Sequence, residues 1–493
     1  MKNNIFKIVV LAVGLFSLSS CETDLDKINE NPNDQANIDP KYLLTYVSKS
    51  AFAVQGDPMY ASRMLIGTDG ENIYQYMKWN DASFGTYSTD LLNTMKMMQE
   101  AERINNKNYQ AIGKFYRAFH FYNLSLKFGS IPYSEAIKGE SGITQPKYDS
   151  QETVMAGVLN ELKQANDLIN SSDAIAGDII FNGDATKWKK LINSFRLKVL
   201  MTLSKKTTIG GINIATEFAS IAGSQSLMTS IQDNGELKFA DAADSRYTTF
   251  NSSGYGSSLY MANYFINMFK DRQDPRIFTF AEQTTSAKEN GLAITNFNGY
   301  NGGNPTSPYA DNAALIIAKN ISKVNERFYK DATNEPSSIL SYAELEFILA
   351  EATARGWISG SAKMHYDNAI KASFQFYQTY VKNSNQYFAG FNVDNYLASS
   401  LVLYNNSAPL QNQLEKIITQ KYMTMFHQGQ WTSYQDYLRT GYPNLPLQTG
   451  VTAPSRFRYP QVEYNYNNIN LQAALTAQYN GQDNITLKPW WLQ

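Results

Sequence analysis

The stretch IGKFYRAFHFYNLSLKFGSIPYSEA, residues 112–136, decides the fold class of this chain. Large apolar side chains recur in it at steps of three and four: Ile112, Phe115, Phe119, Tyr122 and Leu126. An α-helix has about 3.6 residues per turn, so this spacing places them all on one helix face. Gly129 then supplies the backbone freedom that ends a helix. The stretch therefore predicts a helix with a buried face, followed at once by a tight loop.

The same helical period recurs along most of the chain. Apolar stripes with steps of three and four occupy residues 155–169, 188–203, 366–380 and 414–425. Ser341 and Glu344 form a capping box ahead of a further helix that runs through Ala354. Residues 207–244 and 297–311 break the pattern, and the alternation typical of strands is scarce. The pattern predicts a mainly α fold of TPR-like helix pairs, without a clean repeat of about 34 residues.

The first residues have the layout of an export signal. Lys2 and Lys7 precede an apolar run over residues 8–16, which is shorter than the roughly 20 residues that a membrane-spanning helix needs. Leu18-Ser19-Ser20-Cys21 follows, and Cys21 is the only cysteine. This ending is typical of a bacterial lipoprotein signal, in which Cys21 becomes the acylated first residue. The alternative is an ordinary secretory signal with a cysteine there by chance.

The leader divides the chain into three parts. We expect a signal peptide over residues 1–20, an acidic, Asn-rich lipid tether over 21–39, and a single α-helical domain over 40–493. The mature chain has no second cysteine, so packing rather than disulfides must stabilise it. No later segment is apolar and long enough to predict a membrane-spanning helix.

The amino-acid composition restricts the kinds of molecule that the protein is expected to bind. Removing the two leader lysines leaves 41 basic against 44 acidic side chains, so the mature chain offers no basic field for nucleic acid. Charged residues make up 18% and aromatic residues 13%, with 33 tyrosines. A surface rich in amides, hydroxyls and tyrosine suits neutral polar ligands, although most tyrosines of any protein simply cap its core.

The sequence shows no set of residues typical of a catalytic site. His120, His365 and His427 all fall in helical stretches, and the zinc spacing His-Glu-x-x-His is absent. There is no nucleophile elbow and no P-loop. We therefore predict a protein that is no enzyme and needs no cofactor or metal. The alternative is a glycosidase, which needs only two carboxylates; the densest acidic cluster is Asp271, Asp274 and Glu282.

Several short motifs, in order along the chain, resemble the SusD/RagB family of outer-membrane nutrient-binding lipoproteins. They are Tyr116-Arg117-Ala118, residues 128–136, Gly183-Asp184 with Trp188, Asn193, Ser194 and Arg196, Asp274-Pro275-Arg276, Tyr342-Ala343-Glu344, Gln420-Lys421-Tyr422, residues 439–443, Tyr459-Pro460 with Glu463 and Asn467, and Trp490-Trp491. One departure is the single arginine, Arg439, where many members have two. Arg117, Glu135, Arg196, Glu344 and Arg439 are expected to hold helix pairs together through ion pairs and caps.

The resemblance implies a fold and a role. TPR-like helix pairs would form a scaffold for a loop-rich ligand-binding half. The protein would sit lipid-anchored on the outer membrane, exposed at the cell surface, and serve a SusC-type TonB-dependent transporter. The acidic run Glu22–Asp26 is similar to surface-export signals of such lipoproteins, or is only a solvated tether. The expected ligand is an oligosaccharide; an oligopeptide is the alternative, and a lipid-anchored glycan hydrolase the alternative in function class.

Two aromatic loops are the candidate binding segments. The first, residues 74–87, lies where the family carries stacking rings and an amide, and by position it offers Trp79, Asn80, Phe84 and Tyr87. The second, residues 297–309, offers Tyr300, Asn301 and Tyr309. If the two loops face one another, a sugar stacks on Trp79 and Tyr300 while Asn80 or Asn301 contacts its hydroxyls. The alternative is that these rings form a small satellite core.

The leader generates the first testable prediction. In Cys21→Ala the acceptor of the lipid is gone, so the protein should lose lipid labelling and leave the membrane fraction. Labelled palmitate and membrane fractionation measure both. A variant that is labelled and sediments like the parent protein would contradict the lipoprotein interpretation.

Overall fold

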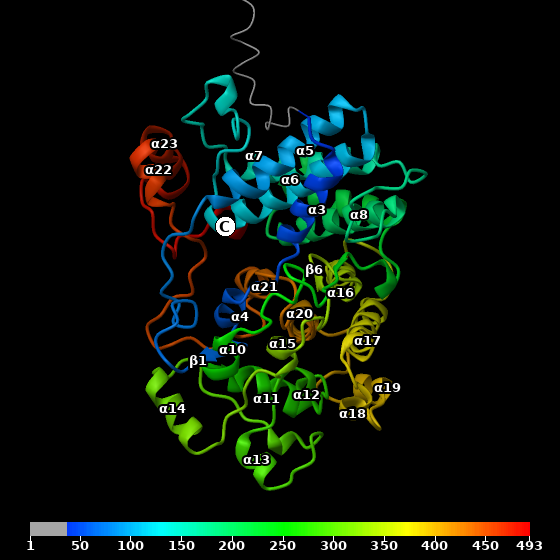
Figure 1. Cartoon of the computed structure of the whole chain (residues 1–493), viewed down its shortest axis with the longest axis vertical. Coiled ribbons are helices and arrows are strands. Elements are labelled where there is room, and N and C mark those ends of the chain that lie inside the picture. The colour runs from blue at the N-terminus through cyan, green and yellow to red at the C-terminus, as the bar shows by residue number, and fades with distance from the viewer. Residues whose placement is uncertain (1–36) are drawn as a thin grey trace, which may run out of the picture. The chain divides into compact units, whose positions relative to one another are not determined.

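The computed structural model of this protein describes residues 37–493, and in them helices far outnumber strands (Figure 1). The prediction of a mainly α fold is confirmed. The predicted signal peptide, Cys21 and most of the predicted tether lie outside the described residues. Residues Pro40–Gln493 form one compact unit, and the description below concerns that unit. Among residues 37–493 no helix is both long and apolar enough to cross a membrane.

A first group of helices packs side by side in the N-terminal half. It contains α3 (Pro40–Ala51), α5 (Leu92–Arg103), α6 (Lys107–Phe128), α7 (Gln151–Leu168) and α8 (Ala185–Thr202). In this group α6 lies between α5 and α7, and α7 lies against α8 (Figure 1). Asn106, Ser150 and Asp184 cap α6, α7 and α8 by accepting hydrogen bonds from backbone N–H groups of the first turn.

A second group follows in the C-terminal half. It contains α16 (Tyr342–Ala354), α17 (Ala362–Tyr380), α20 (Leu410–Met423) and α21 (Thr432–Thr440). Helix α16 packs against both α17 and α20, and it also contacts α8 of the first group. The predicted capping box begins α16, because Ser341 Oγ accepts from the Glu344 N–H at 3.2 Å.

Shorter elements connect and cover the two groups. The remaining helices are α4 (Asp57–Ala61), α9 (Ile214–Ser224), α10 (Ser253–Ser257), α11 (Asn263–Arg272), α12 (Ile277–Phe280), α13 (Thr285–Glu289), α14 (Tyr309–Ile317), α15 (Arg327–Lys330), α18 (Asn385–Phe388), α19 (Val393–Ala398), α22 (Gln461–Tyr466) and α23 (Asn468–Tyr479). The strands form antiparallel pairs: β1 (Leu65–Gly67) with β5 (Leu259–Met261), β2 (Thr208–Ile209) with β3 (Ile212–Asn213), and β4 (Glu236–Leu237) with β6 (Ser337–Ser338).

The apolar stripe from Ile112 to Leu126 forms the centre of the first group. Ile112 and Phe115 are fully buried, and the Phe115 ring packs edge-on against Trp188 of α8 at 5.6 Å. Gly129 ends α6 with φ +94°, and a Cβ there would lie 2.5 Å from Gln478 Oε1 of α23. The backbone conformation therefore requires glycine at this position, and a side chain would also displace Gln478.

Buried ion pairs hold the second helix group together, and one of them joins it to the first group. Lys198 Nζ of α8 lies 3.0 Å from Glu344 Oε1 of α16, and Lys421 Nζ of α20 lies 2.8 Å from Asp436 Oδ2 of α21. Arg439 reaches Glu351 Oε2 and Asp436 Oδ1, each at 2.8 Å. The family motif residues Glu344 and Arg439 thus have the structural role expected from their helical positions.

Two histidines are buried without ion-pair partners. His427 stacks on Phe328 with ring centroids 4.2 Å apart, and neither of its ring nitrogens has a hydrogen-bond partner among the described residues. Burial, with a smaller contribution from Arg327, lowers the pKa of His427 well below its usual value. Burial likewise lowers the pKa of His120 to about 4. Both rings are therefore neutral in the folded protein at pH 7.

This burial generates a pH prediction. Between about pH 6.5 and the lowered folded-state pKa, the unfolded chain binds protons that the folded protein does not. The contribution of each neutral ring is thus complete above about pH 6.5 and is lost as the pH falls. We expect the free energy of unfolding to drop by about 1–2 kcal/mol per buried histidine between pH 6.5 and 5. Urea unfolding at several pH values measures it.

The variant His427→Asn should flatten this slope, because asparagine tolerates the positive φ of 58° at this position and does not titrate. His365→Asn is the matched control, since Nδ1 of His365 lies 2.7 Å from Glu346 and the ring has a partner. An unchanged slope in His427→Asn would contradict the prediction.

Candidate ligand-binding site

The first aromatic loop, residues 74–87, crosses from β1 to α5. Asp81 forms a parallel bridge with Arg458, and Arg458 N–H donates to the Asn80 carbonyl at 2.9 Å. The loop ends in a single turn of π-helix, η1 (Tyr87–Leu91), which leads directly into α5. Such turns are rare and frequently occur at functional sites.

Trp79 lies in the core and not at the surface. Its side chain is among the largest fully buried ones, and the residue is 2% exposed. The indole packs against Phe457 at 5.7 Å, Tyr434 at 5.4 Å and Trp431 at 5.9 Å, and its N–H donates to the Arg456 carbonyl at 3.4 Å. Trp79 therefore fastens the loop to the C-terminal part of the chain.

Tyr300 is equally enclosed. It is 1% exposed, packs on Phe278 at 5.2 Å, and its hydroxyl donates to the Ile294 carbonyl at 2.7 Å. The side-chain amide of half-buried Asn301 donates to the Asn320 carbonyl at 2.9 Å. Tyr309 is 40% exposed at the start of α14. The expectation that a sugar stacks on Trp79 and Tyr300 does not fit this burial; the satellite-core alternative does.

The two loops nevertheless touch. Tyr76 hydroxyl donates to the Ser307 carbonyl at 2.9 Å, and Gln75 Nε2 lies 3.4 Å from the Pro305 carbonyl. Their contact uses the beginning of the first loop and the end of the second. Asn80 is exposed at the surface, with its carboxamide oxygen 3.3 Å from Arg458 Nη1.

The remaining two candidates, Phe84 and Tyr87, line a groove of about 430 Å³. This lies within the range of about 300–1,000 Å³ typical of small-ligand sites. One wall is the segment Phe84–Leu92, and the other is the loop of residues 132–146 between α6 and α7. Glu463 of α22 closes one side. We call this the aromatic groove.

Local contacts hold both rings in place. Phe84 packs edge-on against Phe128 at 4.9 Å and lies 5.3 Å from Tyr87. Tyr87 hydroxyl donates to the Pro132 carbonyl at 2.6 Å. Burial, with nearby Glu463 as the next cause, raises the pKa of Tyr87 well above its usual value, so its hydroxyl stays protonated.

The rim of the aromatic groove carries a few charged groups. Glu463 accepts hydrogen bonds from Tyr148 hydroxyl at 2.8 Å and Asn467 Nδ2 at 3.1 Å. Glu135 accepts from the Lys147 N–H at 2.8 Å, and Lys138 is exposed. The walls between them are apolar and include Leu92, which is 48% exposed. The groove thus combines ring faces and aliphatic walls with polar groups at its edge.

Part of this groove was not among the residues that the sequence predicted to bind a ligand. Residues 128–136 and Glu463 were singled out only as family motif residues, and Leu92 and Ile143 were not considered. The available signal was the chain of apolar residues after Pro132, but nothing local indicates that they face Phe84. Tyr148 and Asn467 bring α22 to this loop through contacts between residues more than 300 positions apart.

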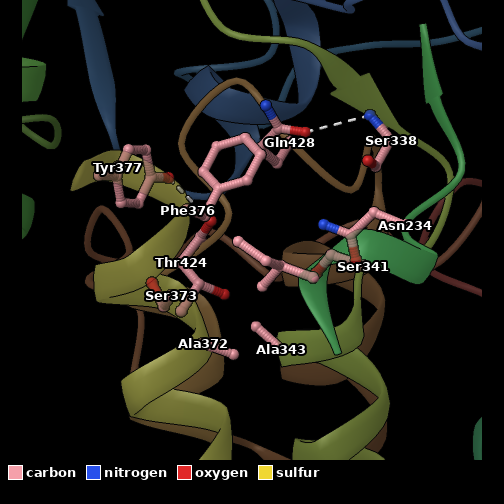
Figure 2. A pocket seen from close by; sticks show the side chains of 11 residues that line it. Asn234, Ser338, Ser341, Ala343, Ala372, Ser373, Phe376, Tyr377, Thr424 and Gln428 are labelled. Carbon is pink, nitrogen blue, oxygen red and sulfur yellow. Dashed lines mark hydrogen bonds between the residues drawn. The ribbon is translucent and has the colours of Figure 1, made fainter. Parts of the chain in front are cut away.

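Two other cavities are too small for a sugar. One, of about 20 Å³, lies between α16 and α17 and is lined by hydroxyls and amides such as Ser338, Ser373 and Gln428 (Figure 2). This volume suits about one water molecule. The other, of about 10 Å³, lies within the buried ion pairs around Lys198 and Arg439.

The acidic cluster considered for catalysis has other partners. Asp274 is fully buried, bonds Arg276 Nη2 at 2.6 Å and accepts from Tyr396 hydroxyl at 2.6 Å. Glu282 pairs with Lys288 at 2.6 Å, and Asp271 is exposed. Asp274 is therefore not placed to attack a ligand. Among residues 37–493, no group of three or more His, Cys, Asp or Glu side chains is placed to hold a metal ion.

Several known proteins are similar to this chain. A family model described as SusD-like, starch-binding and associating with the outer membrane, matches residues 33–460. A SusD homolog from Bacteroides fragilis is 46% identical, with 93% of this chain and 100% of that one covered and a TM-score of 0.89. An outer-membrane protein of Bacteroides vulgatus, described as involved in nutrient binding, is 44% identical (92% and 100% covered, TM-score 0.89). A chitin-binding protein at 22% identity (92% and 99% covered, TM-score 0.71) shares the fold. No curated protein matches the chain.

The position of Trp79 generates a stability prediction. Trp79→Ala should cost about 3–5 kcal/mol of unfolding free energy, because it leaves a cavity among packed rings. Urea denaturation measures this cost. Phe84→Ala, at a half-buried ring, should cost clearly less, so it serves as the matched control. Equal stability of Trp79→Ala and the parent protein would contradict the burial of this indole.

Proposed function

This chain belongs to the SusD-like family, and we propose that it captures oligosaccharides at the outer membrane and passes them to a SusC-type TonB-dependent transporter. Residues 1–20 would direct export, acylated Cys21 would hold the protein on the cell surface, and residues 21–39 would tether the domain of residues 40–493. The protein would bind its ligand without transforming it.

The observation that carries the proposal is the aromatic groove. Phe84 and Tyr87 hold their rings beside a cavity of about 430 Å³, at and just before the π-helical turn that leads into α5. An aromatic ring stacks on the apolar face of a pyranose, and carboxylates and an ammonium at the rim can bond its hydroxyls. A pre-formed groove of this kind suits reversible capture, because little order must be gained on binding.

Oligopeptides are the second candidate. The aliphatic walls at Leu92, Ile137 and Ile143 suit apolar side chains, and Glu135 and Lys138 at the rim carry opposite charges. These features would serve the side chains and termini of a peptide as well as they serve a sugar. The two candidates differ in salt dependence, because a neutral glycan forms no ion pairs while a peptide bound through its charges does.

Calorimetry on the mature chain tests the proposal, with maltoheptaose and chitohexaose as glycans. We expect affinities on the order of μM to mM, little affected by salt. Phe84→Ala should weaken binding about 5- to 30-fold, which corresponds to a lost stacking ring worth about 1–2 kcal/mol. Phe250→Ala, at a half-buried phenylalanine outside the groove, is the control and should bind normally.

Equal affinity in Phe84→Ala and Phe250→Ala would place the glycan elsewhere. Binding of a mixed peptide library instead of either glycan would favour the oligopeptide candidate. Release of new reducing ends from the glycans by the pure protein would support the hydrolase and contradict the proposed function.

A further inference from the structure

The segment that supplies Phe84 and Tyr87 to the aromatic groove also borders a second, polar cavity. Thr86 and Asp90 line this cavity, whose volume is about 100 Å³. A face of α6 forms its floor, and Gln430 and Trp431, just before α21, form another side. We call it the polar cavity. Neither Phe84 nor Tyr87 lines it.

The floor is a stripe of polar residues along α6. His120, Asn123 and Lys127 all line the polar cavity, at helical steps of three and four. His120 and Lys127 are seven residues apart, so they lie on the same face about 10 Å from each other along the axis. The stripe is about as long as a monosaccharide, but the cavity of about 100 Å³ lies below the range of about 300–1,000 Å³ typical of small-ligand sites, so it suits the charged end of such a ligand rather than the whole of it.

Unused hydrogen-bonding groups point to a ligand. His120 is 6% exposed, and its Nε2 has no hydrogen-bond partner among the described residues. Asn123 donates through Nδ2 to the Phe119 carbonyl at 2.9 Å, and Gln430 donates through Nε2 to the Ala51 carbonyl at 3.1 Å. Their side-chain carbonyl oxygens remain available as acceptors. Buried polar groups are normally satisfied, so the unpartnered Nε2 of buried His120 is unusual, while Asn123 and Gln430 are half-buried and add acceptors beside it.

The charges of the polar cavity favour an anion at one end. In residues 37–493 no carboxylate lies within 4.0 Å of Lys127, although the lysine is half-buried. Burial lowers the pKa of Lys127, and the more distant Asp57 opposes this effect. Asp57 itself is hydrogen-bonded to Tyr74. At the other end, Asp90 accepts hydrogen bonds from Ser50 and Thr89 hydroxyls, so its carboxylate already has partners.

We propose that the polar cavity binds a small polar ligand bearing a carboxylate, with the carboxylate at Lys127 and the body of the ligand against the Trp431 ring. A half-buried ammonium without a partner gains more from an anion than an exposed one does, because it is already partly desolvated. Half-buried Trp431 lines the same cavity and offers it apolar ring surface. A uronic acid unit and the C-terminal end of a peptide share this chemistry.

Calorimetry on the mature chain, with D-galacturonate, D-galactose and the dipeptide Ala-Ala as probes, tests the inference. We expect galacturonate, Ala-Ala or both to bind, and galactose to bind at least about 10-fold more weakly than the acid. Raising the salt concentration should weaken binding of the acid. Binding of galacturonate alone identifies a sugar acid as the source, and binding of Ala-Ala alone identifies a peptide terminus.

Variants of Lys127 assign the effect to this cavity. Lys127→Met should weaken acid binding roughly 10- to 100-fold, whereas Lys127→Arg should keep the preference for the acid because it keeps the charge. Lys107→Met, at an exposed lysine on the same helix but outside the cavity, should bind like the parent protein. Circular dichroism identifies a variant that fails to fold. If Lys127→Met does not fold, the preference of Lys127→Arg for the acid tests the proposal in its place.

Three outcomes would overturn the inference. They are no binding of either acid, equal affinity for galacturonate and galactose, or unchanged acid affinity in a folded Lys127→Met. None depends on Phe84→Ala, so failure here and failure of the proposed function are separate results.

Discussion

The arrangement of the described domain depends on one buried cluster of charges. Lys198, Glu344, Lys421, Asp436 and Arg439 come from four helices. The Lys198–Glu344 pair joins α8 of the first group to α16 of the second, and the other pairs, with Glu351, hold α16, α20 and α21 together. Burial by itself would raise the pKa of Glu351, but Arg439 lowers it below its usual value, so the pair stays ionised. Removing one member of such a cluster typically costs about 3–5 kcal/mol, because the other charge is left buried and unpaired.

This rigid junction explains how a loop can serve as a binding surface. Trp79 fixes the first aromatic loop to Tyr434 of α21, the helix that also carries Asp436 and Arg439. Beyond Trp79 the chain runs as Phe84–Leu92 over α6, with Leu91 buried against the core. One side of that segment borders the aromatic groove, and the other borders the polar cavity. The aromatic groove and the polar cavity thus share the short segment Phe84–Leu92, which Trp79 anchors to the core.

Local signals predicted much of the framework. The stripe from Ile112 to Leu126 is buried in α6, and Ser341 caps α16 as its capping box predicts. Arg196 pairs with Glu217 at 3.0 Å, and Arg117 pairs with Glu161, in line with the ion-pair role expected of these motif arginines. These features were accessible because helix period, caps and charge on a helix depend on residues within a few positions of each other.

The surroundings of the two aromatic loops could not be predicted from local signals in this way. The sequence by itself determined that residues 74–87 are an aromatic loop ahead of a helix, and that the chain is mainly helical. Only the tertiary structure decided that Trp79 is core while Phe84 and Tyr87 border a groove. The physical reason is distance along the chain: Trp79 is buried by Trp431, Tyr434 and Phe457, more than 350 residues away, and no local pattern predicts such contacts. An aromatic residue looks the same in the sequence whether its ring stacks on a ligand or packs in the core of its own protein.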